Sequence, residues 1–384
     1  MLKKLVLSAY LFPLFLAATL VRAEVMMPSP PSLAAESWVL MDAATGRVLV
    51  EHNADEQLPP ASLTKMMTSY IVAEEIEQGS IDHDDPVPIS VTAWQMGGSK
   101  MFVREGTEVS VIDLLRGVII QSGNDASVAL AEFVAGSEDA FADLMNQQAS
   151  LLGMDNSHFE NATGWPAEGH LTTARDLALL ARAMIREHPE HYDLYAEKYF
   201  EYNGIKQPNR NRLLWRDSSV DGIKTGHTEA AGYCLVASAE RDDMRLISVV
   251  MGTDSESARA RESQKLLSYG FRYYETAQVY SAGDILVEDN RVWYGETDSV
   301  DLISGEDVVL TLPRGARESL ETKVRVEPAL KAPLEAGGEV GRLTVSYQGE
   351  QLADSPVVAA ETVPEGGFFS RLWDAILLFF HNLF

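Results

Sequence analysis

The sequence contains a single cysteine, Cys234, among its 384 residues. One cysteine excludes an intramolecular disulfide, so a chain of this length depends on its hydrophobic core for stability. Hydrophobic residues make up 46% of the chain, which is enough for a sizeable core. Cys234 follows Tyr233 and precedes Leu235 in a strand-like run, and we therefore expect it to be a buried core residue rather than a reactive thiol.

Basic residues are also scarce. The sequence has 31 Lys and Arg but 57 Asp and Glu, which gives a formal net charge of −26. Proteins that bind nucleic acids neutralise phosphates with basic patches, so this balance argues against a nucleic-acid partner. The sequence also lacks metal-ligand spacing. His188, Glu190 and His191 do not form the H-E-x-x-H pattern, and we expect them to lie in a solvated loop. We predict no metal and no cofactor.

The N-terminus has the pattern of a secretory signal peptide. Lys3 and Lys4 precede a largely apolar run, and Val21-Arg22-Ala23 resembles a small-residue cleavage site. We predict that residues 1–23 are the signal peptide and that the mature protein is exported.

The rest of the chain predicts an α+β domain over residues 24–276, with helices packed against an antiparallel sheet. Short alternating runs separated by Gly, Pro and Asp then predict a small all-β domain over residues 277–360. The predicted strands of the first domain are 37–42, 47–51, 222–226, 232–240 and 244–251. Its predicted helices are 62–78, 111–120, 126–134, 173–187 and 259–274.

The last predicted segment, residues 361–384, contains an amphipathic helix. Residues 368–384 hold five Phe and one Trp but also charged residues, and the segment is too short to span a bilayer. On a helical projection the polar residues of this segment lie within about a third of the circumference, and the apolar Leu378 lies among them. The polar residues are Ser370, Arg371, Asp374, His381 and Asn382. We expect this helix to lie in a membrane interface; the alternative is a terminal helix docked on the protein's own core.

The first candidate for catalysis is the sequence Ser62-Leu63-Thr64-Lys65 at a helix start. Residues three apart share a helix face, so the two polar side chains can meet. A serine hydroxyl needs a base to become a nucleophile, and a lysine with a lowered pKa can be that base. Alone, a four-residue S-x-x-K pattern is weak evidence.

Two further polar segments follow along the chain. Ser122-Gly123-Asn124 lies in a predicted turn between helices, where Ser122 can relay a proton and Asn124 can hold a substrate amide. Lys224-Thr225-Gly226 ends a predicted strand, where it offers a cation, a hydroxyl donor and space for substrate. The backbone N–H of His227 can form an oxyanion hole with that of Ser62. This backbone role makes a catalytic histidine side chain unnecessary.

The order S-x-x-K, S-x-N, K-T-G is that of penicillin-binding proteins and serine β-lactamases. The segments "PPASLTKMMTSYIV", "VIIQSGNDASVALAEFVAG", "QPNRNRLLW" and "VDGIKTGHT" closely resemble the D-alanyl-D-alanine carboxypeptidases among the low-molecular-mass penicillin-binding proteins. The resemblance covers nearly the whole mature chain, and "VVLTLPRG" extends it into the β-rich domain.

The resemblance implies a serine enzyme that removes the terminal D-Ala from peptidoglycan pentapeptide stems and that β-lactams acylate. Ser62 would be the nucleophile and Lys65 the general base, with Ser122 and Lys224 in the proton relay and at the substrate carboxylate. Arg210 matches a family arginine that helps to bind this carboxylate, although Arg212 and Arg216 lie nearby. The family further implies a location at the periplasmic face of the bacterial inner membrane, reached through the C-terminal helix.

Three alternatives remain open. A β-lactamase of the same fold would need a deacylating glutamate, and Glu160 has no asparagine four residues after it. An endopeptidase that cuts peptidoglycan cross-links would share the site. A non-catalytic β-lactam sensor or scaffold would keep its acyl group and release no D-Ala.

Overall fold

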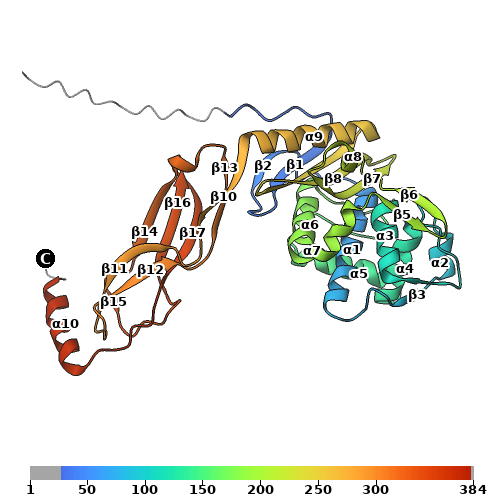
Figure 1. Ribbon diagram of the computed structural model, residues 1–384. Helices are drawn as coiled ribbons and strands as arrows, with labels where there is room; N and C mark the ends of the chain where they lie inside the picture. Colours follow the sequence, from blue (N-terminus) through green and yellow to red (C-terminus); the bar gives the residue numbers. More distant parts are fainter. Residues whose placement is uncertain (1–26, 382–384) are drawn as a thin grey trace, which may run out of the picture.

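The computed structural model describes residues 27–381 (Figure 1). The predicted signal peptide at 1–23 and the last three residues of the chain lie outside this range. A domain of helices and a five-stranded sheet is followed by a β-rich domain and then by helix α10 at the far end (Figure 1). This arrangement confirms the predicted fold class.

The sheet of the first domain is fully antiparallel, with the strand order β2-β1-β9-β8-β7. Its strands are β1 (Ser37–Asp42), β2 (Val48–His52), β7 (Val220–Thr228), β8 (Gly232–Arg241) and β9 (Met244–Thr253). All five coincide with predicted strands to within a few residues. The β8–β9 turn contains Asp242 at φ +52°, a conformation that aspartate tolerates in tight hairpins.

Helices cover both faces of this sheet. In β1, Val39 and Met41 pack into one core while Trp38 and Leu40 pack into a second, as strand alternation requires. The second core lies under α9 (Glu256–Tyr273), and the first is shared with the larger helical group. That group comprises α1 (Lys65–Glu77), α2 (Val91–Gln95), α3 (Val111–Arg116), α4 (Asn124–Ala135), α5 (Glu138–Leu151), α6 (Ala174–Glu187) and α7 (Pro189–Tyr192).

Most of these helices match the predicted ranges, and α6 begins where expected because the Thr173 hydroxyl accepts from Asp176 N at 3.1 Å. Helices α2, α5 and α7 were not predicted. The remaining short elements are η1 (Ala61–Thr64), η2 (Gly117–Gln121), η3 (Asp193–Ala196) and α8 (Leu213–Arg216). Two further antiparallel pairs are β3 (Pro86–Pro88) with β4 (Glu108–Ser110), and the hairpin of β5 (Tyr199–Tyr202) with β6 (Ile205–Pro208).

The prediction for Cys234 is confirmed, whereas the prediction for His188 and His191 is not. Cys234 is buried in β8, as expected, and burial raises the pKa of its thiol to about 11. The prediction that His188 and His191 lie in a solvated loop is wrong. Both are buried near the α6–α7 junction, where His188 Nδ1 lies 2.9 Å from a Glu77 carboxylate oxygen and His191 Nε2 lies 3.0 Å from His83 Nε2.

The β-rich domain is built on a six-stranded sheet with the order β14-β16-β17-β12-β11-β15, next to a β10–β13 pair. Its strands are β10 (Tyr274–Tyr280), β11 (Ile285–Trp293), β12 (Ser299–Ser304), β13 (Val308–Pro313), β14 (Glu321–Val326), β15 (Leu330–Lys331), β16 (Glu339–Tyr347) and β17 (Glu350–Ala359), with η4 at Arg317–Ser319. β10 spans the predicted boundary at residues 276 and 277. The β1–β2 turn of the first domain contacts this domain, since Arg47 Nη1 donates to Thr311 O at 2.8 Å.

Helix α10 (Phe368–His381) rests on the β-rich domain by its polar side. Asp374 is buried and accepts from Tyr294 N at 2.7 Å, and Leu378 is also buried. The aromatic side faces outward, with Phe369 and Trp373 exposed by 83% and 62%. No helix within residues 27–381 has the length and apolar character needed to cross a membrane.

Candidate active site

Ser62 lies in η1, directly before α1, and Lys65 is the first residue of α1. The Nζ atom of Lys65 lies 3.4 Å from Ser62 Oγ, as the spacing of three residues predicts. Ala61 precedes them with φ at +47°, a left-handed conformation that residues other than glycine rarely adopt. Such local strain tends to cluster at functional sites.

The Lys65 side chain is fully buried and held by two other acceptors. Its Nζ donates to Asn124 Oδ1 at 2.7 Å and to the Thr163 backbone oxygen at 2.5 Å. Burial, together with the Arg210 guanidinium, lowers the pKa of Lys65 to about 7. A large share of this amine is therefore neutral at neutral pH, and a neutral amine beside a serine hydroxyl can take its proton.

The Thr163 carbonyl is positioned by a loop that the sequence analysis missed. Asn161 Oδ1 accepts from the backbone N–H groups of Thr163, Gly164 and Trp165 and thereby organises the turn. At Gly164, with φ +79°, a Cβ would lie only 1.8 Å from the Ala61 oxygen. Only glycine allows this loop to approach the nucleophile so closely. The available signal was the polar, glycine-containing turn sequence itself.

Ser122 follows the π-helical turn η2 and has φ +60° and ψ +36°, again left-handed. This conformation ends the helix and leaves the Ser122 hydroxyl 2.8 Å from Lys224 Nζ, which donates to it. Both side chains are buried. Burial and the nearby cation of Lys65 hold the pKa of Lys224 well below its usual range. The structure thus brings together two serine–lysine pairs from four separate elements.

Strand β7 carries Thr225, Gly226 and His227 along the edge of the sheet. A Cβ at Gly226 would meet Pro60 O at 3.0 Å and Leu63 Cγ at 3.2 Å, so this glycine lets the strand pack directly on the nucleophile-bearing segment. The His227 ring stacks on Tyr233 with centroids 3.9 Å apart. His227 directly follows Gly226, the residue through which β7 approaches the segment of Pro60 and Leu63.

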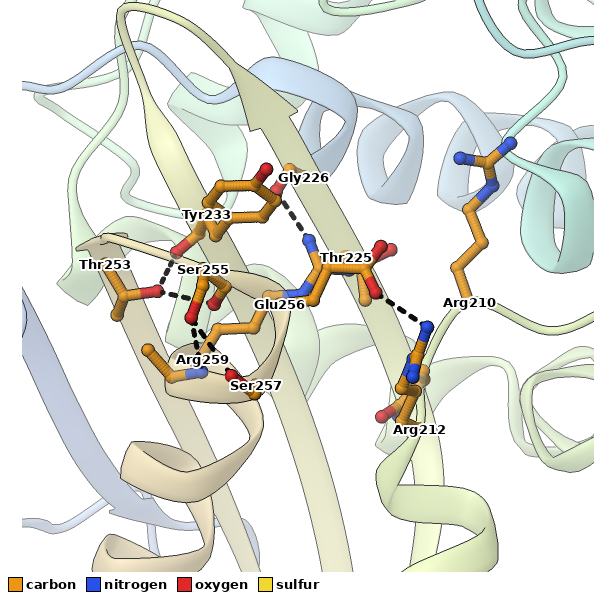
Figure 2. A network of polar contacts seen from close by, with 12 residues as sticks. Arg210, Arg212, Thr225, Gly226, Tyr233, Thr253, Ser255, Glu256, Ser257 and Arg259 are labelled. Carbon is orange, nitrogen blue, oxygen red and sulfur yellow. Dashed lines mark hydrogen bonds and ion pairs between the residues drawn. The ribbon is translucent and has the colours of Figure 1, made fainter.

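Two arginines lie near this strand, and only one was predicted. Arg210 Nε donates to Gln121 O at 3.1 Å, one residue before Ser122. Arg259 is buried in α9 and its Nη1 donates to Gly226 O at 3.0 Å (Figure 2). Nothing in its local sequence distinguishes Arg259 from other helix arginines, so its position could not be foreseen. Both guanidinium groups contribute to the lowered pKa of Lys224.

Asn124 contacts the catalytic lysine and a neighbouring loop. Its Oδ1 accepts from Lys65, and its Nδ2 donates to Gly97 O at 2.8 Å. The next residue, Asp125, is buried and accepts from the backbone N–H groups of Met101, Phe102 and Val103. In this structure the start of α4 therefore fixes both the amine of Lys65 and the segment that faces it.

The chain resembles known proteins over nearly its full length. Residues 24–255 match the D-alanyl-D-alanine carboxypeptidase family, and residues 274–365 match the C-terminal domain of penicillin-binding protein 5. The chain is 46% identical to D-alanyl-D-alanine carboxypeptidase DacC of Escherichia coli strain K12, over 98% of this chain and 95% of that protein. It is 43% identical to DacA of the same strain, over 100% and 97%.

Solved structures give the same result. Penicillin-binding protein 5 from Haemophilus influenzae is 42% identical, with a TM-score of 0.82 over 88% of this chain and 100% of that chain. Penicillin-binding protein D2 from Listeria monocytogenes, in its ampicillin-bound form, is 31% identical, with a TM-score of 0.58 over 62% of this chain and 98% of that chain. On these matches, the chain belongs to the D-alanyl-D-alanine carboxypeptidase family.

Proposed function

We propose that this protein is a serine-type carboxypeptidase that removes the terminal D-Ala from peptidoglycan pentapeptide stems through an acyl-serine intermediate. The family assignment supports the reaction. The single observation that carries the mechanism is the fully buried Lys65 amine, with a pKa lowered to about 7, at 3.4 Å from Ser62 Oγ. A buried amine of this kind is a base at neutral pH, whereas an exposed lysine is not.

In the acylation step, neutral Lys65 takes the Ser62 proton while Oγ attacks the carbonyl carbon between the two D-Ala residues. The backbone N–H groups of Ser62 and His227 stabilise the oxyanion. The C–N bond then breaks, and the proton that Lys65 took from Ser62 passes to the leaving amine by way of the Ser122 hydroxyl, which is hydrogen-bonded to Lys224, so that Lys65 is neutral again. D-Ala leaves, and Ser62 carries the acyl group.

The carboxylate of the leaving D-Ala lies toward Lys224, the Thr225 hydroxyl and Arg210. These groups supply positive charge and a hydrogen-bond donor on the Ser122 side of the nucleophile. Asn124 completes the site by holding the Lys65 amine. Gly226 allows β7 to approach the segment that carries Ser62. β-Lactams present a similar carbonyl and carboxylate and acylate Ser62; the ampicillin-bound Listeria relative supports this.

In deacylation, water attacks the acyl carbon and restores the Ser62 hydroxyl. The Glu160 carboxylate lies 3.1 Å from His158 Nε2 on the surface, which disfavours a role as a β-lactamase base. Lys65 remains the base closest to Ser62 Oγ among the described hydrogen-bond partners. We infer that Lys65 serves both half-reactions, which favours a carboxypeptidase that a β-lactam blocks over a fast β-lactamase.

The sequences of residues 1–23 and 361–384 support a proposal for the location of the protein. We propose a signal peptide at 1–23, a catalytic domain at 24–276, a β-rich domain at 277–360 and a membrane-anchoring segment at 361–384. The protein would be exported and held peripherally at the periplasmic face of the inner membrane. The outward aromatic face of α10, with Phe369 and Trp373 largely exposed, supports this proposal.

The test is to follow D-Ala release from a diacyl-L-Lys-D-Ala-D-Ala peptide and, by intact-protein mass spectrometry, the acyl group left by penicillin. We expect D-Ala release with wild type and neither D-Ala nor acyl-protein with Ser62→Ala. Ser346→Ala in the β-rich domain is the matched control and should behave as wild type. Full D-Ala release by Ser62→Ala would disprove the mechanism. A stable acyl group on a protein that releases no D-Ala would identify a sensor instead.

A further inference from the structure

A groove of about 450 Å³ opens next to Arg210, on the side of the site that the proposed function assigns to the leaving group. It lies between the β5–β6 hairpin and α8. Its volume is within the usual range for ligand pockets. The side chains that matter here are Tyr199, Arg210, Arg212, Trp215, Arg216 and Glu256.

The groove carries an excess of positive charge in a protein of formal net charge −26. Three arginines line it, and the one carboxylate, Glu256, is paired with Arg212 at 2.9 Å (Figure 2). Within residues 27–381, Arg210 and Arg216 form no ion pair. Unpaired cations on an otherwise acidic surface create a local potential that attracts carboxylates.

One wall of the groove is apolar. Trp215 and Tyr199 are 41% and 51% exposed, and their rings meet edge to face at 5.9 Å. Two exposed aromatic rings can cover the methylene groups of a bound side chain while the arginines bind its charged end. The groove therefore fits a short aliphatic chain that ends in an anion.

A second pocket near the catalytic lysine has different chemistry. Its volume is about 500 Å³, and it is lined by Trp165, Val91 and Met96 among others, with Glu138 but no lysine or arginine. Thr163, whose carbonyl accepts from Lys65, also lines it. Of these two pockets, only the groove next to Arg210 carries basic side chains.

We propose that the cationic groove binds the side chain of the released residue and favours a C-terminal D-amino acid whose side chain ends in a carboxylate, such as D-Glu. This inference rests on the proposed function. The chemistry is unchanged: the C–N bond breaks, the amine takes a proton and leaves as the free D-amino acid, and water later releases the acyl group. Only the identity of the leaving residue is extended beyond D-Ala.

The test uses the full mature chain and three peptides, diacetyl-L-Lys-D-Ala followed by D-Ala, D-Glu or its neutral isostere D-Gln. The quantity is the ratio of kcat/KM for D-Glu to that for D-Gln. We expect a ratio of about two to five, the effect of one partly exposed charge pair. Arg216→Ala should lower the ratio to about one, and Arg216→Lys, which keeps the charge, should largely restore it.

Arg342→Ala in the β-rich domain is the matched control, since it removes one surface arginine away from the groove, and should leave the ratio at its wild-type value. Labelling by a fluorescent penicillin verifies that each variant is folded. A wild-type ratio of one or less, or a ratio unaffected by Arg216→Ala, overturns the groove assignment. If no D-amino acid is released from any of the three peptides, the proposed function itself is wrong, so the two failures can be told apart.

Discussion

The catalytic centre and helix α10 are both unusual in what they bury. The catalytic centre buries lysine side chains, which are normally exposed, whereas α10 exposes aromatic side chains, which are normally buried. Lys65 and Lys224 are buried by nearly their whole surface, whereas Phe369 and Trp373 are 83% and 62% exposed. Buried amines and exposed aromatic clusters both reduce the stability of the isolated folded chain. We propose that binding partners explain both features. The buried lysines act on a bound substrate, and the exposed aromatic rings of α10 bind a lipid surface.

The two regions also differ in how they are held. Lys65 is fixed from three directions, by η1, by Asn124 and by the loop that ends at Thr163. Helix α10 is attached through Asp374 and Leu378 alone among its buried side chains within the described residues. A catalytic base must be rigid to be positioned, whereas an anchor needs only a fixed orientation of its apolar face.

The largest expected effect concerns the buried base. Lys65→Met keeps the length of the side chain and removes its amine, so acylation of Ser62 by benzylpenicillin should slow by about 10³-fold, within the range for general-base catalysis. Intact-protein mass spectrometry after timed mixing measures the rate. The control, Lys323→Met on exposed strand β14, should have the wild-type rate. An acylation rate for Lys65→Met within a few-fold of wild type would exclude Lys65 as the base.

The second effect concerns the exposed aromatic face. Phe369→Ser combined with Trp373→Ser removes two aromatic rings from the proposed membrane contact. At about 1.5–3 kcal/mol for each buried aromatic side chain, affinity for anionic phospholipid vesicles should fall by about 100-fold or more. Vesicle co-sedimentation measures it, with Ile285→Ser, an exposed apolar residue of β11, as the control. Unchanged co-sedimentation of the double variant would contradict the anchor, and D-Ala release should be unaffected throughout.

The third effect is the pH dependence of acylation. Burial lowers the pKa of Lys65 to about 7, so the active, neutral amine gains population as the pH rises through that value. At pH 6 only about one tenth of the amine is neutral. The rate constant for benzylpenicillin should therefore rise about ten-fold between pH 6 and 8 and then level off. A flat profile over this range, or a rise continuing to pH 10, would show that Lys65 does not titrate as described.

Much of the catalytic centre could be predicted from sequence because its chemistry lies in short, local patterns. Ser62 and Lys65 meet because three residues separate them on one helix. The strand carrying Cys234 follows from an apolar run between turns. The aromatic face of α10 could likewise be read from helical periodicity, including the unusual place of Leu378, which the structure explains by burying it beside Asp374.

The features that could not be predicted from sequence depend on contacts between segments that are distant in the chain. The Thr163 acceptor is a backbone carbonyl, and a backbone group carries no signature in the residue type. Arg259 reaches Gly226 from a helix on the other side of the sheet from the main helical group. The burial of His188 and His191 depends on Glu77 and His83, more than a hundred residues earlier in the chain. Tertiary packing rather than local propensity decided these positions.

The smallest expected effect concerns the attachment of α10 itself. Asp374 accepts from Tyr294 N and lies 3.3 Å from Arg291 Nη2, so Asp374→Ala should leave the Tyr294 N–H buried without its acceptor and loosen the helix. Hydrogen exchange at Tyr294 and along α10 should quicken by about five-fold or more, the equivalent of about 1 kcal/mol. Glu365→Ala removes a more exposed ion pair with Arg371 at 2.7 Å and is the matched control, with little expected change. Because Asp374 orients the helix without belonging to its apolar face, vesicle binding should persist in Asp374→Ala. Unchanged exchange would show that Leu378 and its neighbours hold the helix, and that the buried carboxylate does not.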